Sequence, residues 1–232
     1  MIRSPSSIRF PVLQELSLNG YRFEGENASI DDFWPELPQL RSLRLEECVL
    51  EGGGLTQLLS RTNTKLRSLA LFSVRHPKGG EELPSFLADS LEELWIEKCW
   101  PLSLESHLPS YIGLRSLHLD WHLFAKVVPF VPPNLLSLSI TVPRYVAASA
   151  PDYHRFEAEL EYLSVYLPSL QEIRVMGQRG FPLLDHEAEL RKKMNLQAVS
   201  LIIELVHRGQ GGHFLPFVSA IFNYVIPQLV FL

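Results

Sequence analysis

A short pattern of aliphatic residues recurs seven times between Leu13 and Val175. In each copy, aliphatic residues occupy the first, fourth and sixth positions of a short segment. The fourth and sixth positions point to the same side of a β-strand, because side chains alternate along a strand with a period of two. The pattern therefore predicts short strands that direct aliphatic side chains into a core. The copies are Leu13-Leu16-Leu18, Leu40-Leu43-Leu45, Leu66-Leu69-Leu71, Leu91-Leu94-Ile96, Leu114-Leu117-Leu119, Leu135-Leu138-Ile140 and Leu170-Ile173-Val175.

The spacing between the copies predicts a repeating architecture. Their first positions lie 27, 26, 25, 23, 21 and 35 residues apart, and a period in the twenties with this internal spacing is typical of a leucine-rich repeat. One unit cannot bury its aliphatic face alone, whereas stacked units bury it against each other. We therefore predict an α/β leucine-rich-repeat solenoid of about seven to eight irregular units. A curved parallel sheet would form its concave side, and short helices and loops its convex side.

The segments between the strands differ in length. Residues 54–60, 83–88 and 123–128 have helix-like content but span only one or two turns, so they need the stack for stability. The connection over residues 152–167 is longer and is flanked by Pro151 and Pro168, which favours a full helix there. This helix explains the 35-residue unit. Its apolar residues recur at helical spacing, at Phe156, Leu160, Leu163 and Leu167.

The C-terminal part predicts one more unit and then a change of character. Residues 186–193 favour a helix, and residues 194–201 an eighth strand, 26 residues after Leu170. We expect a repeat domain over residues 1–208 and an apolar tail over residues 209–232, in which His213 is the only titratable side chain apart from a tyrosine. Three interpretations of the tail remain open: packing on the last repeat, insertion into a membrane, or an artefactual truncation. Its prolines, Pro216 and Pro227, make the membrane the least favoured.

Composition restricts the classes of function. The net charge of −5 and the pI near 5.9 argue against a nucleic-acid binder, which needs a basic face. Only two cysteines occur, and the N-terminus lacks an apolar run of signal-peptide length, so we expect an intracellular protein, cytoplasmic or nuclear.

Cys48 and Cys99 have two interpretations. In the functional one they form a redox pair or are two metal ligands. In the structural one they are small buried side chains in equivalent positions of their repeats. Equivalent positions two units apart lie about 10 Å from each other, too far for a disulfide, so we expect no bridge.

The two cysteines also carry a resemblance. Each stands three residues after the third aliphatic of its unit, in the segments 40–50 and 91–99. This placement resembles the cysteine-containing leucine-rich repeats of F-box proteins, and the recurrent Leu-Arg-Ser-Leu and Leu-Glu-Glu-Leu segments look like fungal F-box-like arrays. The resemblance covers roughly Pro11 to Leu201. It implies protein recognition through the concave face, as substrate selection for a cullin-type ubiquitin ligase, with a Skp-type adaptor as a further partner only if an F-box exists elsewhere.

One departure from that family concerns the F-box itself. An F-box is a helical module of several tens of residues ahead of the repeats, and the ten residues before Pro11 cannot hold one. We therefore expect a fragment, a divergent paralogue, or a protein whose ligase-docking half is lost or supplied elsewhere. The alternative function is an interaction scaffold with no ligase link, or a truncated fragment without its own activity.

The concave face is the predicted place of binding. The third, fifth and seventh positions of each unit point out of the sheet when the aliphatic positions point inward. Aromatic and charged residues gather at these positions in the middle units, as is typical of a binding hot spot. The alternative is that a flanking loop covers these aromatics or that they are tolerated surface residues. The predicted partner-binding residues are Arg44, Phe72, Trp95, Glu97, His118, Asp120 and Trp121.

Catalysis is not predicted. His118 and Asp120 occupy neighbouring outward positions and His122 follows, but no motif places a serine or cysteine nucleophile with them. His186 lacks the second histidine of a zinc motif, and the glycines at 52–54 lack the lysine of a phosphate loop. We expect no enzyme activity, no cofactor and no metal.

Overall fold

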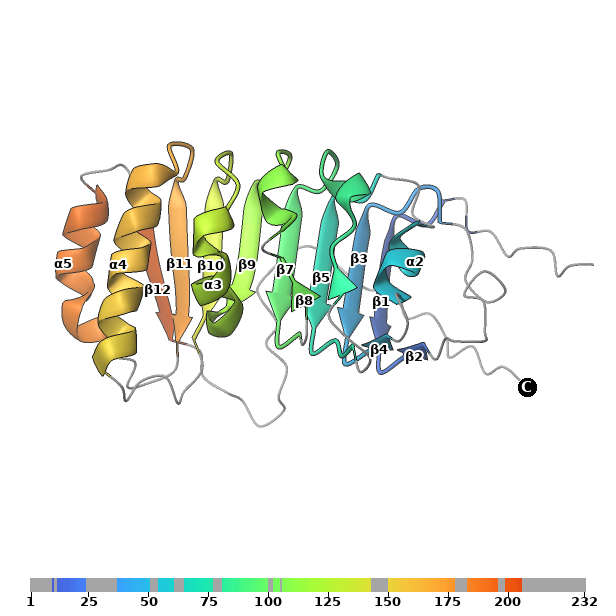
Figure 1. Cartoon of the computed structure of the whole chain (residues 1–232), viewed down its shortest axis with the longest axis horizontal. Coiled ribbons are helices and arrows are strands. Elements are labelled where there is room, and N and C mark those ends of the chain that lie inside the picture. The colour runs from blue at the N-terminus through green and yellow to red at the C-terminus, as the bar shows by residue number, and fades with distance from the viewer. Residues whose placement is uncertain are drawn as a thin grey trace, which may run out of the picture.

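One open sheet of parallel strands organises the chain. The structure is a computed structural model and describes residues 10, 12–23, 37–50, 54–60, 65–76, 81–99, 102–104, 106–142, 150–177, 183–195 and 199–205. Within these residues, eight strands pair side by side in the order in which they occur along the chain (Figure 1). They are β1 (Glu15–Asn19), β3 (Ser42–Glu46), β5 (Ser68–Phe72), β7 (Glu93–Glu97), β9 (Ser116–Asp120), β10 (Ser137–Thr141), β11 (Glu172–Gly177) and β12 (Ser200–Leu205).

The register aligns the repeated aliphatic positions across the sheet. Leu16 pairs with Leu43, Leu43 with Leu69, and Leu69 with Leu94, and the same alignment continues through the later strands. From the second unit on, the three aliphatic residues of each copy are buried, whereas those of the first unit are only partly buried. All seven predicted strands are therefore confirmed, and the aliphatic rows form one continuous core.

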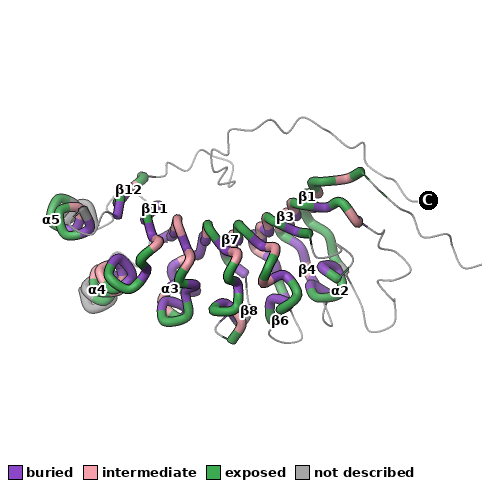
Figure 2. Tube along the Cα trace, turned by 90° about the horizontal axis from the view of Figure 1, so that it is seen from above, coloured by how far each residue is buried: buried purple, intermediate pink, exposed green. Residues whose placement is uncertain are grey.

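The helices in the described part of the chain lie on one side of the sheet. The sheet is curved, with its strands along the inner side of the arc and the helices along the outer side (Figure 2). This arrangement confirms the α/β class with a curved parallel sheet. The helices are α2 (Gly54–Ser60), η1 (Ser85–Leu87), η2 (Leu108–Ser110), α3 (Trp121–Val127), η3 (Val128–Phe130), α4 (Ala150–Tyr166) and α5 (Leu183–Asn195).

The long helix α4 agrees with its sequence prediction. Its apolar residues Phe156, Leu160 and Leu163 are buried, and Leu167 just beyond it is buried too. The ring of Phe156 packs edge-on against Phe124 of α3 at 5.6 Å between centroids. Neighbouring helices of the outer layer therefore pack on each other as well as on the sheet.

The prediction of the eighth strand was wrong in register. The helix before it, α5, extends to Asn195 and includes Met194, and β12 begins only at Ser200. Leu201 pairs with Ile173 and Ile203 with Val175, so the inward residues of this strand are Leu201 and Ile203. The residues around Val199 are apolar at successive positions, so Val199 or Leu201 could pair with Ile173. Because α5 extends to Asn195, the strand begins later and Leu201 takes this place. The predicted tail, residues 209–232, lies outside the described residues.

A left-handed turn follows each of the first four strands of the main sheet, β1, β3, β5 and β7. The residue at the eighth position of the unit has a positive φ in all four cases, and three of these residues are not glycine. Its N–H donates to the carbonyl of the seventh residue in the next unit in three cases, for example from Ser73 to Glu97 at 2.8 Å. The four residues are Gly20, Glu47, Ser73 and Lys98, with φ of 72°, 54°, 53° and 55°.

The two cysteines occupy equivalent positions directly after such turns. The S–H of Cys48 is within hydrogen-bonding distance of the carbonyls of Leu18 and Glu46, and that of Cys99 of the carbonyls of Leu71 and Glu97. Both are buried free thiols, and burial raises the pKa of Cys99 to about 12. The structural interpretation of the cysteines is therefore confirmed, and the expected absence of a bridge agrees with two free thiols.

Two short strand pairs flank the main sheet. β2 (Arg22–Phe23) pairs with β4 (Val49–Leu50), and β6 (Glu81–Glu82) with β8 (Leu102–Ser103).

No helix among the described residues has the length and apolar character needed to cross a membrane.

Candidate partner-binding face

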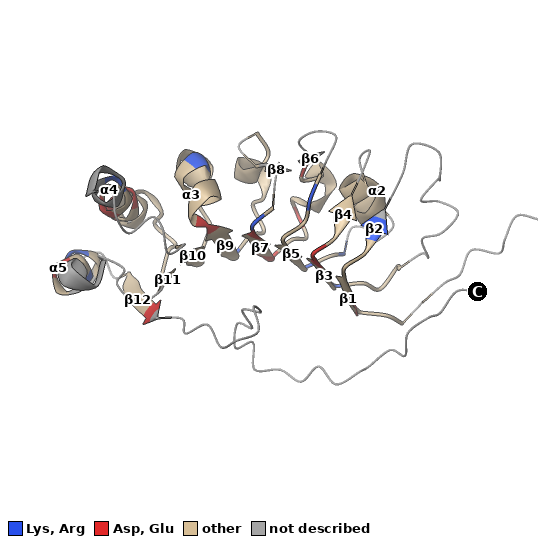
Figure 3. Cartoon of the chain, turned by 90° about the horizontal axis from the view of Figure 1, so that it is seen from below, with Lys and Arg blue, Asp and Glu red and all other residues tan. Residues whose placement is uncertain are grey.

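The inner face of the sheet carries a negative charge. On each of its eight strands, the third, fifth and seventh positions of the unit lie on the face away from the helices. Seven of these side chains are acidic and two, Arg44 and Arg174, are basic, and acidic positions recur along the strand layer (Figure 3). Both arginines already pair with acidic neighbours, Arg44 with Glu46 at 3.3 Å and Arg174 with Glu172 at 3.2 Å.

A continuous row of side-chain contacts crosses the middle of this face. We call it the aromatic row. The guanidinium of Arg44 lies over the ring of Phe72, 4.3 Å from its centroid, and Phe72 contacts Trp95 at 5.6 Å between ring centroids. Trp95 stacks on His118, which in turn forms a hydrogen bond with Thr141. The row therefore joins β3, β5, β7, β9 and β10 through five side chains: Arg44, Phe72, Trp95, His118 and Thr141.

His118 lies next to Trp95 in the row and is held there as a neutral ring. Only 2% of it is exposed, and Nε2 lies 3.0 Å from the hydroxyl oxygen of Thr141. Burial lowers the pKa of His118 to about 3, because the charged imidazolium would lose its hydration. Its other nitrogen, Nδ1, is buried and has no hydrogen-bond partner among the residues that the structure describes.

Glu97 contributes a buried carboxylate beside the row. It is the register partner of Phe72, and only 3% of the residue is exposed. Its Oε1 lies 3.0 Å from the ammonium of Lys98, the next residue along the chain. Its Oε2 is buried and has no hydrogen-bond partner in the described part of the chain.

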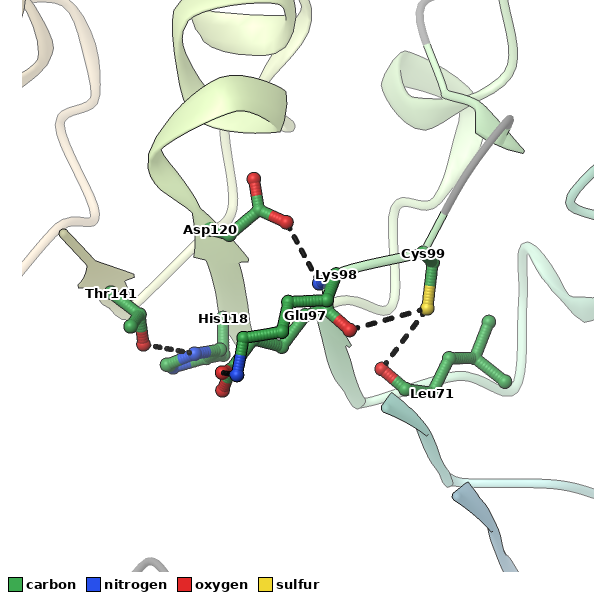
Figure 4. Close-up of polar contacts among 7 residues, drawn as sticks. All are labelled: Leu71, Glu97, Lys98, Cys99, His118, Asp120 and Thr141. Carbon is green, nitrogen blue, oxygen red and sulfur yellow. Dashed lines mark hydrogen bonds and ion pairs between the residues drawn. The ribbon is translucent and has the colours of Figure 1, made fainter. Parts of the chain in front are cut away.

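Asp120 has a structural role at the end of β9. Its Oδ1 accepts a hydrogen bond from the N–H of Leu123 at 3.0 Å, which caps the N-terminus of α3. Its Oδ2 accepts from the N–H of Lys98 at 2.8 Å, and Figure 4 shows the carboxylate directed toward this backbone rather than toward His118. The side chain of Asp120 therefore accepts the N–H of the turn residue, whereas in the three earlier units a backbone carbonyl accepts it.

The prediction that Trp121 belongs to the binding cluster was wrong. Trp121 is the first residue of α3, and only 9% of it is exposed. Its ring packs on Phe156 at 4.5 Å and on Phe124 at 6.3 Å between centroids. Because the chain enters a helix directly after Asp120, the next side chain turns into the layer between the helices and the sheet.

Burial of the remaining predicted residues is greater than expected for exposed aromatics. Phe72, Glu97 and His118 are buried, whereas Trp95 and Arg44 are partly exposed. Neighbouring strands lie about 4.8 Å apart, so side chains that stack across strands cover each other's faces. The structure thus brings Arg44, Phe72, Trp95, Glu97 and His118 together, with Trp95 and Arg44 offering the accessible surface.

His118, Asp120 and His122 are neighbours in the sequence but have separate surroundings in the structure. Both oxygens of Asp120 bind backbone N–H groups, and His122 lies exposed on α3. Among the described residues, no three His, Cys, Asp or Glu side chains gather as a group that could hold a metal ion.

Two features of the surface escaped the sequence prediction. Thr141 completes the aromatic row: it pairs in register with Asp120 and lies diagonally across from His118, so only the register of β9 and β10 could have placed it there. On the outer side, Tyr162 and Tyr166 stack at 4.2 Å between ring centroids and are exposed on α4. Their spacing of four residues on a predicted helix was the available signal.

Comparison with known protein families finds no matching family, and comparison with curated proteins finds no matching protein.

Proposed function

We propose that the chain is a leucine-rich-repeat solenoid whose inner sheet face recognises a protein partner without catalysis. The repeat assignment is supported by the aligned aliphatic rows, by units of 21 to 35 residues, and by helices confined to the outer side. Such arrays present an extended concave surface, which is the part of the fold that repeat proteins use for binding.

The observation that carries this proposal is the aromatic row. Large aromatic side chains next to charged groups dominate the binding energy of protein interfaces. Trp95 is partly exposed at the middle of the row, and Arg44 at its end keeps 28% of its side chain exposed. Buried neighbours hold both in place, so the surface is preorganised, which reduces the entropy lost on binding.

The proposed biological context comes from the resemblance to F-box repeat arrays. In that context, the sheet face selects a substrate for a cullin-type ubiquitin ligase, and a Skp-type adaptor docks on an F-box. The cysteine positions support the resemblance, because Cys48 and Cys99 make the same pair of carbonyl contacts in their two units. An interaction scaffold with no ligase link is the alternative.

The two parts of the proposal are tested by one affinity purification of the full-length natural protein. Co-purification of a Skp-type adaptor is the result expected for the ligase context, and its absence would favour the scaffold. Partner capture should fall by about tenfold or more with Trp95→Ala, as expected when an aromatic hot-spot residue is truncated.

The matched control is Tyr166→Ala on α4. Tyr166 is 63% exposed and belongs to α4, a helix of the outer side, so partner capture should not change. Equal capture by the Trp95→Ala and wild-type proteins would contradict recognition through the inner face.

A further inference from the structure

Around Trp95, the sheet face buries polar atoms that the chain does not satisfy. Nε1 of Trp95, Oε2 of Glu97 and Nδ1 of His118 are all buried, and in the described structure none has a hydrogen-bond partner. Glu97 and His118 are 3% and 2% exposed as whole residues. Buried polar atoms without partners are rare in folded proteins, so three in one place mark this part of the face as a candidate binding site.

These three atoms come from one small area of two neighbouring strands. Trp95 and His118 are register partners on β7 and β9. Glu97 follows Trp95 by two residues on the same face, about 7 Å along the strand. We call this area the Trp95 site and define it by Trp95, Glu97 and His118. One extended peptide can reach all of it.

The chemistry of the Trp95 site defines what its ligand must offer. An indole N–H only donates a hydrogen bond and an ionised carboxylate only accepts. The ligand therefore needs an acceptor for Trp95 and a donor for Glu97. A backbone carbonyl meets the first need, and a charged donor meets the second best, because hydrogen bonds between oppositely charged groups are the strong ones.

The charge of the surroundings favours a cation over an anion. Seven acidic residues and two basic ones occupy the outward positions of the sheet, and both arginines pair with acidic neighbours. His118 is neutral, since burial lowers its pKa to about 3, so it does not repel a cation. Lys98, with a side chain that is 54% exposed, pairs with Oε1 of Glu97 and leaves Oε2 as the oxygen to be paired.

We propose that the Trp95 site receives a lysine or arginine side chain from an extended basic segment of the protein partner. The cation pairs with Oε2 of Glu97, and a neighbouring backbone carbonyl of the segment accepts the N–H of Trp95. This inference rests on the proposed function, because it specifies the chemistry of the partner that the inner face binds.

A random 12-residue peptide library displayed on phage, selected on the intact chain, tests the inference. Peptides whose binding is lost with Trp95→Ala are then synthesised, and their affinity is measured for wild type, Glu97→Gln and Glu93→Gln. Glu93 is the matched control, because it lies exposed on the same face of β7 and its substitution removes the same charge. We expect lysine or arginine at one shared peptide position, a loss of about tenfold or more with Glu97→Gln, and less than about threefold with Glu93→Gln.

Each other outcome contradicts a distinct claim. Trp95-dependent peptides without a shared lysine or arginine, or equal losses with Glu97→Gln and Glu93→Gln, would overturn the cation site and leave the binding face intact. Failure to select any Trp95-dependent peptide would contradict the proposed function itself. If Glu97→Gln does not fold, replacing the shared peptide cation by norleucine makes the same test from the partner's side, with the same expected loss.

Discussion

The indole of Trp95 stacks on the imidazole of His118, with 3.5 Å between the ring centroids and 11° between the ring planes. The two residues are register partners on β7 and β9, so the stack ties adjacent strands together on the inner face. It also places the partly exposed indole beside a buried neutral ring. The same contact therefore contributes to the packing of the sheet and to the surface proposed for binding.

This stack should appear as a coupling energy. We predict that Trp95→Leu and His118→Leu are less destabilising together than the sum of the single changes, by about 0.5–1.5 kcal/mol, because aromatic pairs stabilise beyond the area they bury. Urea unfolding of the single and double variants measures it. The control pair is Trp95→Leu with Met176→Leu on β11, which should be additive because these positions lie three strands apart. Additivity in the first pair would show that the stack contributes nothing.

The buried His118 should make stability depend on pH. Burial lowers its pKa from 6.5 to about 3, so between these values the unfolded chain binds a proton that the folded chain does not. Its contribution to stability is complete above about pH 6.5 and is lost as the pH falls toward 3, with a slope of up to about 1.4 kcal/mol per pH unit. Denaturant unfolding at several pH values measures this slope.

Two variants separate the histidine from its hydrogen bond. His118→Phe keeps a stacking ring and should remove this part of the slope. Thr141→Val removes the hydrogen-bond partner and should lower stability by about 1 kcal/mol at every pH while the slope stays. An unchanged slope in His118→Phe would mean that His118 is charged or accessible in the folded chain.

Asp120 should matter for stability through its two backbone contacts. Asp120→Ala removes the cap of α3 and the acceptor of the Lys98 N–H, so we predict a loss of about 1–2 kcal/mol. Asp120→Asn keeps an oxygen that can cap the helix and should cost less. Thermal or urea unfolding compares the two. Equal costs would show that the cap is not what Asp120 contributes.

The left-handed turns predict a stabilising substitution. Ser73 has a φ of 53°, a conformation that is unfavourable by about 1–2 kcal/mol for residues other than glycine. Ser73→Gly should therefore raise the free energy of unfolding by about 0.5–1 kcal/mol. The control is Ser68→Gly in the same unit, where glycine replaces an extended strand residue of β5 and should destabilise. Destabilisation by Ser73→Gly would contradict the turn.

Local spacing made the sheet and most helices predictable. The aliphatic positions recur with the two-residue period of a strand, and register then follows, because a slip of one residue would expose every leucine. The helix around Phe156 was predictable for the same reason, from helical spacing between two prolines. The eighth strand was misaligned because the apolar run after Val199 fits more than one register.

The candidate site was predictable only in part. The sequence placed Arg44, Phe72, Trp95, Glu97 and His118 on one face, and the structure brings them together. The sequence did not reveal that these residues are buried, because their burial arises from contacts across strands.

Trp121 was misplaced because the fifth unit enters a helix where the first four make a left-handed turn. Asp120, an N-cap residue type ahead of an apolar segment, was the available signal for this helix start.

Photo-crosslinking from single positions locates the partner on the chain. A benzophenone amino acid at Ser139, which is partly exposed on β10 and pairs in register with His118, reports contact with the inner face. The same amino acid at Tyr166 reports contact with the outer helices. Recognition through the inner face predicts a crosslink from Ser139 that Trp95→Ala abolishes, and none from Tyr166. A crosslink from Tyr166 alone would contradict it.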